Sequence, residues 1–300
     1  MPENLSTSNG LVAPRDGQSV LGQGLAFKAF EIEEPADVYF FRPLGFVVAH
    51  CAARLGLTPN QLTILSMLVG VSGGALLYDE RFGLLGFALL IIYSVFDSAD
   101  GQLARLTARV SELGRVLDGV GGYVTHAAIY FSISAGLLHR GKSGSIVAWA
   151  VLAAIANAVQ AQMYEYHRHH YAMIVVKRFV PRDDPAKIAS PSIRWVYRGY
   201  LAIQQMLNRL HVRVESVIAE RSTAGAVRED DRARYRDCFC WPMRGWNLLG
   251  DNARFCAIGV LVCLHRIDLF FAFILGPMNV ALLALWFWQR SADRKFLASF

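Results

Sequence analysis

Residues 82–122 read FGLLGFALLIIYSVFDSADGQLARLTARVSELGRVLDGVGG, an uncharged run followed by a segment with three aspartates. The uncharged part, Phe82–Phe96, has 15 residues. As an α-helix it would be about 22 Å long, which is too short for the ~30 Å hydrocarbon layer of a membrane. To cross a membrane, this helix must continue through Asp97 and Asp100 toward Leu106. We therefore expect these two carboxylates to lie at or within the membrane boundary, where ionisable groups are costly and mark functional sites.

Other parts of the chain are also apolar enough to cross a membrane. Hydrophobic residues make up 54% of the 300 residues and charged residues 18%, and the mean hydropathy is +0.32, which is too apolar for an ordinary soluble domain. Four uncharged runs have 19 to 22 residues each: Asn60–Tyr78, Gly119–Leu138, Ser143–Tyr164 and Leu269–Trp288. A further span over Trp246–His265 would carry Asp251 and Arg254. The sequence thus predicts an all-α polytopic membrane protein with six transmembrane helices.

The expected elements divide the chain into four parts. Residues 1–35 are expected to form a mobile cytoplasmic tail, of which residues 1–24 are rich in Ser, Gly, Asn and Pro. Residues 36–178 would hold an N-terminal amphipathic surface helix and the first four transmembrane helices. Residues 179–245 would form a basic cytoplasmic segment. Residues 246–300 would hold the last two transmembrane helices and the C-terminal tail.

The basic residues indicate how the chain is oriented. The net charge is +6, and all but four of the 30 Lys and Arg fall in the tails or in the loops of one side. The four exceptions are Arg81, Arg140, Lys142 and Arg266. This positive-inside bias predicts cytoplasmic N- and C-termini, and we expect a bacterial inner membrane protein surrounded by membrane lipids. It accounts for the basic charge without a nucleic-acid partner.

The first aspartates share one helical face with small residues. On a helix, Asp97, Asp100, Gly101 and Ala104 follow at i, i+3, i+4 and i+7 and form a single stripe. Glycine and alanine have almost no side chain. Next to paired acids that could bind metal ions, they would leave room for a nucleotide diphosphate to approach those ions closely.

A second stripe is expected on the next helix, where Gly114, Asp118 and Gly122 are four residues apart. The connection between the two helices is short, so the stripes should face each other. Three converging carboxylates repel one another unless a cation compensates them. Because all the ligands are oxygens, Mg²⁺, Mn²⁺ or Ca²⁺ is favoured over zinc. The alternatives are ion pairs between the aspartates and nearby arginines, and simple close helix packing at the glycines.

The spacing of these residues resembles the signature of the CDP-alcohol phosphotransferase family, D-x-x-D-G-x-x-A-R-x8-G-x-x-x-D-x-x-x-D. Seven positions match in order: Asp97, Asp100, Gly101, Ala104, Arg105, Gly114 and Asp118. The TPNQLT run at Thr58–Thr63 is similar to the family's first-span motif, and the surface helix and six spans extend the resemblance over most of the chain.

The resemblance implies an enzyme that transfers a substituted phosphate from a CDP-linked alcohol to another alcohol, with release of CMP, in phospholipid or related lipid synthesis. We expect the acceptor to be a lipid alcohol. Two divalent metals, Mg²⁺ or Mn²⁺, would be held by Asp97, Asp100 and Asp118. The nucleotide-binding residues would be Asn60, Thr63, Gly101, Ala104, Arg105 and Gly114. A homodimer is also considered.

The sequence departs from the family signature at its last position. The fourth aspartate, which in the family is a metal ligand and the proposed general base, is Gly122 here. The catalytic base is therefore unknown from the sequence. His126 on the same helix is a candidate, beside a metal-bound water or the acceptor's own phosphate. A catalytically degenerate member that binds nucleotide or lipid without turnover, and a transporter that uses the carboxylates as a proton relay, are the alternative functions.

Overall fold

The computed structural model describes residues 30–109, 111–175, 204–222 and 226–300. Within these ranges the secondary structure is helical and contains no β-strand, which confirms the predicted all-α class. The first 29 residues of the expected tail and the first part of the expected basic segment lie outside the described residues.

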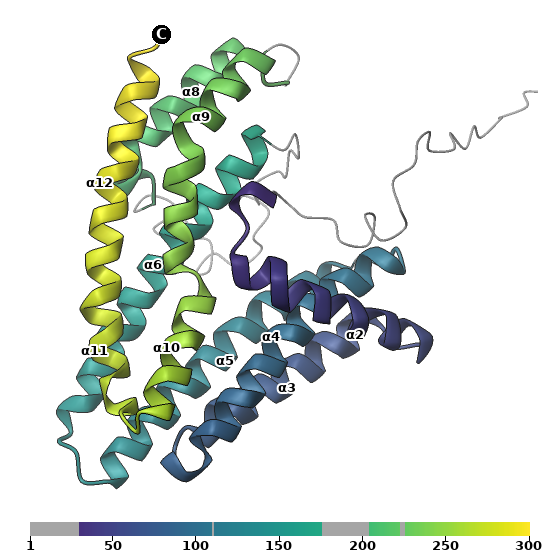
Figure 1. Cartoon of the computed structure of the whole chain (residues 1–300), viewed down its shortest axis with the longest axis vertical. Helices are drawn as coiled ribbons and strands as arrows, with labels where there is room; N and C mark the ends of the chain where they lie inside the picture. Colours follow the sequence, from purple (N-terminus) through teal and green to yellow (C-terminus); the bar gives the residue numbers. More distant parts are fainter. Residues whose placement is uncertain (1–29, 110, 176–203, 223–225) are drawn as a thin grey trace, which may run out of the picture.

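The N-terminal half begins with short helical turns that lead into four helices. A 3-10 turn, η1, covers Phe30–Ile32, and a π turn, η2, covers Asp37–Phe41. The four helices are α2 (Arg42–Arg54), α3 (Pro59–Leu76), α4 (Gly83–Leu106) and α5 (Glu112–His139), with the 3-10 turn η3 (Glu80–Phe82) before α4. Figure 1 shows these helices grouped together, and α4 packs against both α2 and α3.

The start of α3 follows from its sequence. Thr58 is the N-cap, and its side chain accepts a hydrogen bond from the backbone N–H of Gln61. The side chain of Gln61 in turn accepts from the backbone N–H of Thr58, which completes a capping box. Pro59 occupies the first helical turn, where its missing N–H costs nothing. The uncharged run that begins at Asn60 thus lies in a helix that starts one residue earlier, at Pro59.

The C-terminal half consists of α6 and the helices after residue 203. They are α6 (Ser145–Val175), α8 (Arg209–Arg221), α9 (Glu229–Trp246), α10 (Asp251–Cys263), α11 (Phe270–Leu275) and α12 (Pro277–Leu297), with the 3-10 turns η5 (Asn247–Leu249) and η6 (Ile267–Leu269). In Figure 1, α9 lies beside α12 and α6, and α10 reaches across to α4. Trp246, Phe239 and Phe296 are buried where these helices meet.

Three helical stretches are long and apolar enough to cross a membrane within the part of the chain that the structure describes. They are Glu80–Leu106, Ser145–Val175 and Ile267–Leu297. The expected fifth span differs from the structure, because its helix is interrupted by η5 and Gly250. The remaining helix, α10, has 13 residues and is about 20 Å long.

A short N-terminal segment, residues 30–41, is packed against the C-terminal half. Tyr171 donates a hydrogen bond to Glu31 over 2.9 Å, and Arg244 donates to the backbone carbonyl of Glu31 over 2.8 Å. Arg42 at the start of α2 pairs with Glu33 at 2.6 Å. This segment therefore links the start of α2 to α6 and α9, and the tail boundary expected at residue 35 falls inside it.

Candidate active site

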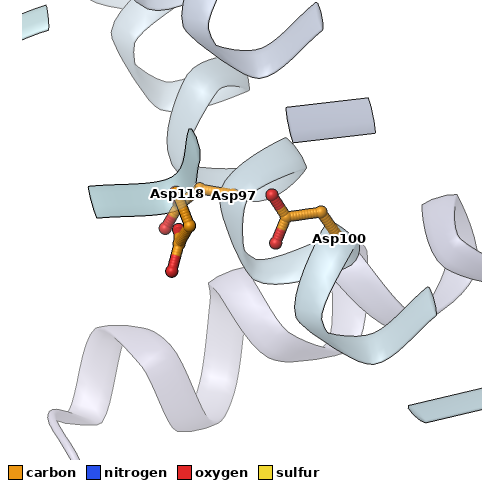
Figure 2. A group of neighbouring side chains, drawn as sticks. All are labelled: Asp97, Asp100 and Asp118. Atoms are coloured by element: carbon orange, nitrogen blue, oxygen red, sulfur yellow. The ribbon is translucent and has the colours of Figure 1, made fainter. Parts of the chain in front are cut away.

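Three carboxylates from two helices converge on one point of the structure. Asp97 and Asp100 lie on α4, and Asp118 lies on α5. Each offers a carboxylate oxygen, and these oxygens all lie within 4.8 Å of one another. Figure 2 shows the Asp100 carboxylate turned toward those of Asp97 and Asp118. The two stripes expected from the sequence therefore do face each other.

The donor set of this cluster fits a hard divalent cation. Three carboxylates this close repel one another strongly, and a cation placed between them removes that repulsion. Oxygen-only ligands of this kind suit Mg²⁺ or Mn²⁺. Asp100 is buried with 6% of its surface exposed, whereas Asp118 is exposed. The cluster is therefore buried at Asp100 and accessible to solvent at Asp118.

Helix α3 supports the buried member of the cluster. The Thr63 hydroxyl lies 2.7 Å from Asp100 Oδ2 and 3.0 Å from the backbone oxygen of Pro59. Thr63 is itself buried. Of the two residues expected from the first-span motif, Thr63 is therefore the one that contacts an aspartate of the cluster.

The second residue of that motif, Asn60, lies against the start of α5. Its side-chain oxygen accepts a hydrogen bond from the Ser111 hydroxyl over 3.1 Å, and Ser111 caps α5 by accepting from the backbone N–H of Gly114 over 2.9 Å. A Cβ atom added at Gly114 would lie 2.6 Å from Asn60 Oδ1. Asn60 and Gly114 are thus neighbours, and only a residue without a side chain fits at position 114 without displacing Asn60.

The cluster opens into a cavity of about 360 Å³ between the two halves of the molecule. Gly101 and Arg105 from the predicted nucleotide side line it, whereas Ala104 is on the same helix without lining it. A Cβ atom at Gly101 would meet only the Arg105 guanidinium, at 3.6 Å. The other polar residues of its wall are Glu34, Asp37, Arg42, Tyr93, Ser94, Ser98, Gln102, Tyr164, Glu165, Arg168, Asp251, Asn252 and Arg254.

The side of the cavity opposite the aspartates, which we call the far wall, was mostly not predicted from the sequence. Glu34 accepts a hydrogen bond from the Tyr164 hydroxyl over 3.0 Å, and Asp37 accepts one from Asn252 over 3.0 Å. Burial and the neighbouring Asp37 raise the pKa of Glu34 to about 7. Burial also raises the pKa of Asp37. These residues come from segments far apart in the sequence, so no local pattern marks them.

The position of the missing fourth aspartate is open. A Cβ atom added at Gly122 would meet only the Tyr93 hydroxyl, at 3.9 Å. The ring of His126 lies one turn further along α5, with Nδ1 2.9 Å from the Gly122 carbonyl oxygen. Its Nε2 is 3.4 Å from Asp251 Oδ1 on α10. The charges of Asp251 and Arg254 in an otherwise apolar stretch were the signal in the sequence that α10 contributes to a site.

Parts of the chain are similar in sequence to known proteins. The chain is 39% identical over 88 residues to the archaetidylinositol phosphate synthase of Pyrococcus horikoshii, a match that covers 29% of this chain and 46% of that protein. It is 32% identical over 115 residues to the bifunctional IPC transferase and DIPP synthase of Aquifex aeolicus, covering 38% and 26%. It is 27% identical over 113 residues to the phosphatidylinositol phosphate synthase of Corynebacterium glutamicum, covering 37% and 52%.

The chain thus spans about half the length, or less, of these relatives. The sequence model of the CDP-alcohol phosphatidyltransferase family matches residues 56–207, just over half of the 300 residues. The matched part contains α3 to α6 and all three clustered aspartates. With the motif, its geometry and this match in agreement, the chain belongs to the CDP-alcohol phosphatidyltransferase family.

Proposed function

We propose that this protein is a membrane CDP-alcohol phosphotransferase that moves a substituted phosphate from a CDP-linked donor to an alcohol acceptor and releases CMP. The observation that carries the proposal is the convergence of carboxylate oxygens of Asp97, Asp100 and Asp118 within 4.8 Å of one another on the wall of a polar cavity. The family to which the chain belongs consists of phosphotransferases of lipid synthesis, and the relatives named above are lipid synthases.

The proposed metal ligands are Asp97, Asp100 and Asp118. They would hold two divalent cations, Mg²⁺ or Mn²⁺, and bound cations would neutralise the donor's diphosphate and stabilise the charge of the transition state. Thr63 supports this role, because its hydroxyl contacts Asp100 and orients it.

The proposed nucleotide side is the surface formed by α3, the end of α4 and the start of α5. Its residues are Asn60, Thr63, Gly101, Ala104, Arg105 and Gly114. The close approach of Gly114 to Asn60 and the open backbone at Gly101 support it, since both keep side chains out of the space beside the aspartates. The Arg105 guanidinium, on the same cavity wall, would attract a phosphate of the donor.

The reaction joins two substrates in this cavity. The acceptor's hydroxyl oxygen forms a bond to the donor's β-phosphorus, and the bond from that phosphorus to the bridging oxygen breaks, so that CMP leaves with the electron pair. We propose a lipid alcohol as the acceptor. The names of two relatives contain inositol phosphate, so inositol phosphate is the polar acceptor to test beside it.

We also propose that six helices cross a bacterial inner membrane and that both termini are cytoplasmic. In addition to the three stretches long and apolar enough to span, this requires α3, α5 and the stretch Trp246–His265, with η5 and α10, to cross. The four-part division at residues 35, 178 and 245 follows from the same topology. Single cysteines placed at Gly144 and at Asp230 in a cysteine-free variant test it. The cysteine at position 144 should react with a membrane-impermeant maleimide on intact cells, and the cysteine at position 230 should react only after lysis.

The test of function is release of CMP by the purified protein in detergent. CDP-diacylglycerol serves as the donor, with either inositol phosphate or a cell lipid extract as the acceptor, in the presence of Mg²⁺. Wild type should release CMP and Asp97→Asn should not. Tight nucleotide binding without any CMP release would instead favour a catalytically degenerate family member.

A further inference from the structure

The site lacks a carboxylate where the family signature has its last one. The backbone at Gly122 leaves the space beside it empty up to the Tyr93 hydroxyl, 3.9 Å from a Cβ atom placed there. Gly122 therefore does not make room for a bulky neighbouring side chain. A reaction that removes a proton from an alcohol still needs a group to accept it, so this group must come from another element.

Asp251, the first residue of α10, presents a carboxylate to the same cavity. Its side chain is 57% exposed, and it lines the cavity together with Asp97. Both of its cationic partners contact one oxygen: His126 Nε2 is 3.4 Å and Arg254 Nη1 is 3.1 Å from Oδ1. Among the described residues, no hydrogen bond is made to Oδ2. One oxygen of Asp251 is thus anchored and the other is available.

The contacts of His126 show that it serves Asp251. Its Nδ1 faces the carbonyl oxygen of Gly122 at 2.9 Å, and its Nε2 faces the carboxylate of Asp251. The carbonyl oxygen only accepts hydrogen bonds, so Nδ1 carries a proton. Nε2 has no hydrogen-bond partner among the described residues and faces the carboxylate at ion-pair distance. His126 thus lies between the backbone of α5, at the vacant position, and the carboxylate on α10.

The start of α10 is held firmly by buried neighbours. Arg254 is 1% exposed and donates to the backbone oxygen of Leu249 over 2.8 Å as well as to Asp251. A Cβ atom at Gly250 would lie 2.0 Å from the Glu34 carboxylate, so the backbone before Asp251 is packed directly against the N-terminal segment. Asp251 is therefore placed by backbone and side-chain contacts on both sides of the cavity.

We infer that Asp251 replaces the missing fourth aspartate as the base of the reaction, with His126 and Arg254 as positioning residues. The inference rests on the proposed function. Asp251 Oδ2 would accept the proton of the acceptor's hydroxyl as that oxygen bonds to the donor's β-phosphorus and CMP leaves. The proton then passes to solvent through the cavity. The carboxylate thus comes from the opposite half of the chain.

The first test compares Asp251→Asn with wild type, using CDP-diacylglycerol as donor and inositol phosphate or lipid extract as acceptor. The asparagine keeps the size of the side chain and cannot take the proton. We expect kcat to fall at least ~10²-fold with little change in the donor's KM. Mn²⁺ binding, followed by electron paramagnetic resonance, should be unchanged, because Asp251 lies outside the 4.8 Å cluster. Asp268→Asn, which removes a carboxylate from η6 outside the cavity, is the matched control and should keep full activity.

The second test restores a carboxylate from the other helix. Gly122→Asp is added to Asp251→Asn, and the space at Gly122 accommodates the new side chain. The double variant should recover at least ~10-fold of the lost kcat. A structural role for Asp251 predicts no recovery, because the new aspartate restores none of the contacts to Arg254.

Each result decides between definite alternatives. Wild-type kcat in Asp251→Asn, or loss of its Mn²⁺ binding, overturns the inference while leaving the proposed function intact. A lasting loss of activity in the double variant, with Mn²⁺ bound normally, also overturns it in favour of a structural role. Absence of CMP release from wild type with both acceptor probes overturns the proposed function itself.

Discussion

The hydroxyl of Thr63 on α3 lies 2.7 Å from Asp100 Oδ2 on α4, and both side chains are buried. This contact joins the first-span motif to the aspartate motif across 37 residues of sequence. It also explains why a threonine is useful at this position, because its hydroxyl reaches both the carboxylate and the backbone oxygen of Pro59. Orientation of a ligand by such a neighbour is a general feature of metal sites.

Thr63→Val keeps the shape of the side chain and removes the hydroxyl. We expect the affinity for Mn²⁺ to fall by about 10-fold, because Asp100 loses the group that orients it. Titration of Mn²⁺ by isothermal calorimetry measures this. Ser66→Ala is the control, since the Ser66 hydroxyl donates to the backbone oxygen of Thr63 and makes no contact with Asp100. Equal Mn²⁺ affinities for Thr63→Val and wild type would contradict the assigned role.

Removal of the metals should stop the reaction. EDTA should abolish CMP release, and Mg²⁺ or Mn²⁺ should restore it. Asp100→Asn should lower kcat at least ~10²-fold, because a ligand that stabilises transition-state charge is lost. Asp79→Asn removes a carboxylate that caps η3 and should leave activity unchanged. Full activity in EDTA would rule out the two-metal mechanism.

Gly114→Ala tests the nucleotide side. The new methyl group would lie 2.6 Å from Asn60 Oδ1 and 3.0 Å from the Ser111 hydroxyl, so Asn60 must move. We expect the donor's KM to rise about 10-fold, because the loss of one hydrogen bond to a charged group has an effect of about this size. The acceptor's KM should be unchanged. Gly119→Ala is the matched control, because a Cβ atom there has no neighbour within 4 Å. Equal changes in both KM values would assign Gly114 to helix packing alone.

Double-variant kinetics test the link between His126 and Asp251. His126→Ala should lower kcat about 10-fold, because the carboxylate loses one of its two anchors. In the Asp251→Asn background the same change should cost almost nothing, since the group that His126 positions is already inactive. The two losses are therefore expected to be strongly non-additive. Independent, additive losses would show that His126 acts apart from Asp251.

The features predicted correctly from the sequence are those that depend on local periodicity. Asp97 and Asp100 are three residues apart, and Asp118 follows after a short connection, so helix geometry alone brings the two stripes together. In each case the residues that interact are close in the sequence or belong to adjacent helices.

The far wall of the cavity could not be predicted in the same way. Its parts are Glu34, Tyr164 and Asp251, which meet only because the N-terminal segment packs between α6 and α10. The sequence showed Asp251 as a charge inside an apolar run but did not show what it faced. The break at η5 and Gly250 was missed too, because hydropathy does not register that Glu34 fills the space beside that glycine.

The buried Glu34 predicts how stability depends on pH. Its side chain is 8% exposed, and burial together with Asp37 raises its pKa from 4.5 to about 7. The folded protein therefore binds this proton more tightly than the unfolded chain. Its contribution to stability is complete below about pH 4.5 and is lost as the pH rises through about 7. The shift corresponds to at most about 3 kcal/mol.

Glu34→Gln removes this titration and keeps an oxygen that can accept the hydrogen bond from Tyr164. The variant should therefore melt at nearly the wild-type temperature at pH 5 and several degrees above it at pH 8, a gain of about 1–3 kcal/mol. Unfolding in detergent, followed by intrinsic tryptophan fluorescence across this range, measures the difference. Glu80→Gln, in the exposed turn η3 before α4, is the control for loss of a carboxylate outside the cavity. A difference between Glu34→Gln and wild type that stays constant from pH 5 to pH 8 would mean that Glu34 is ionised in the folded protein throughout, and that the start of α10 rests against a charge.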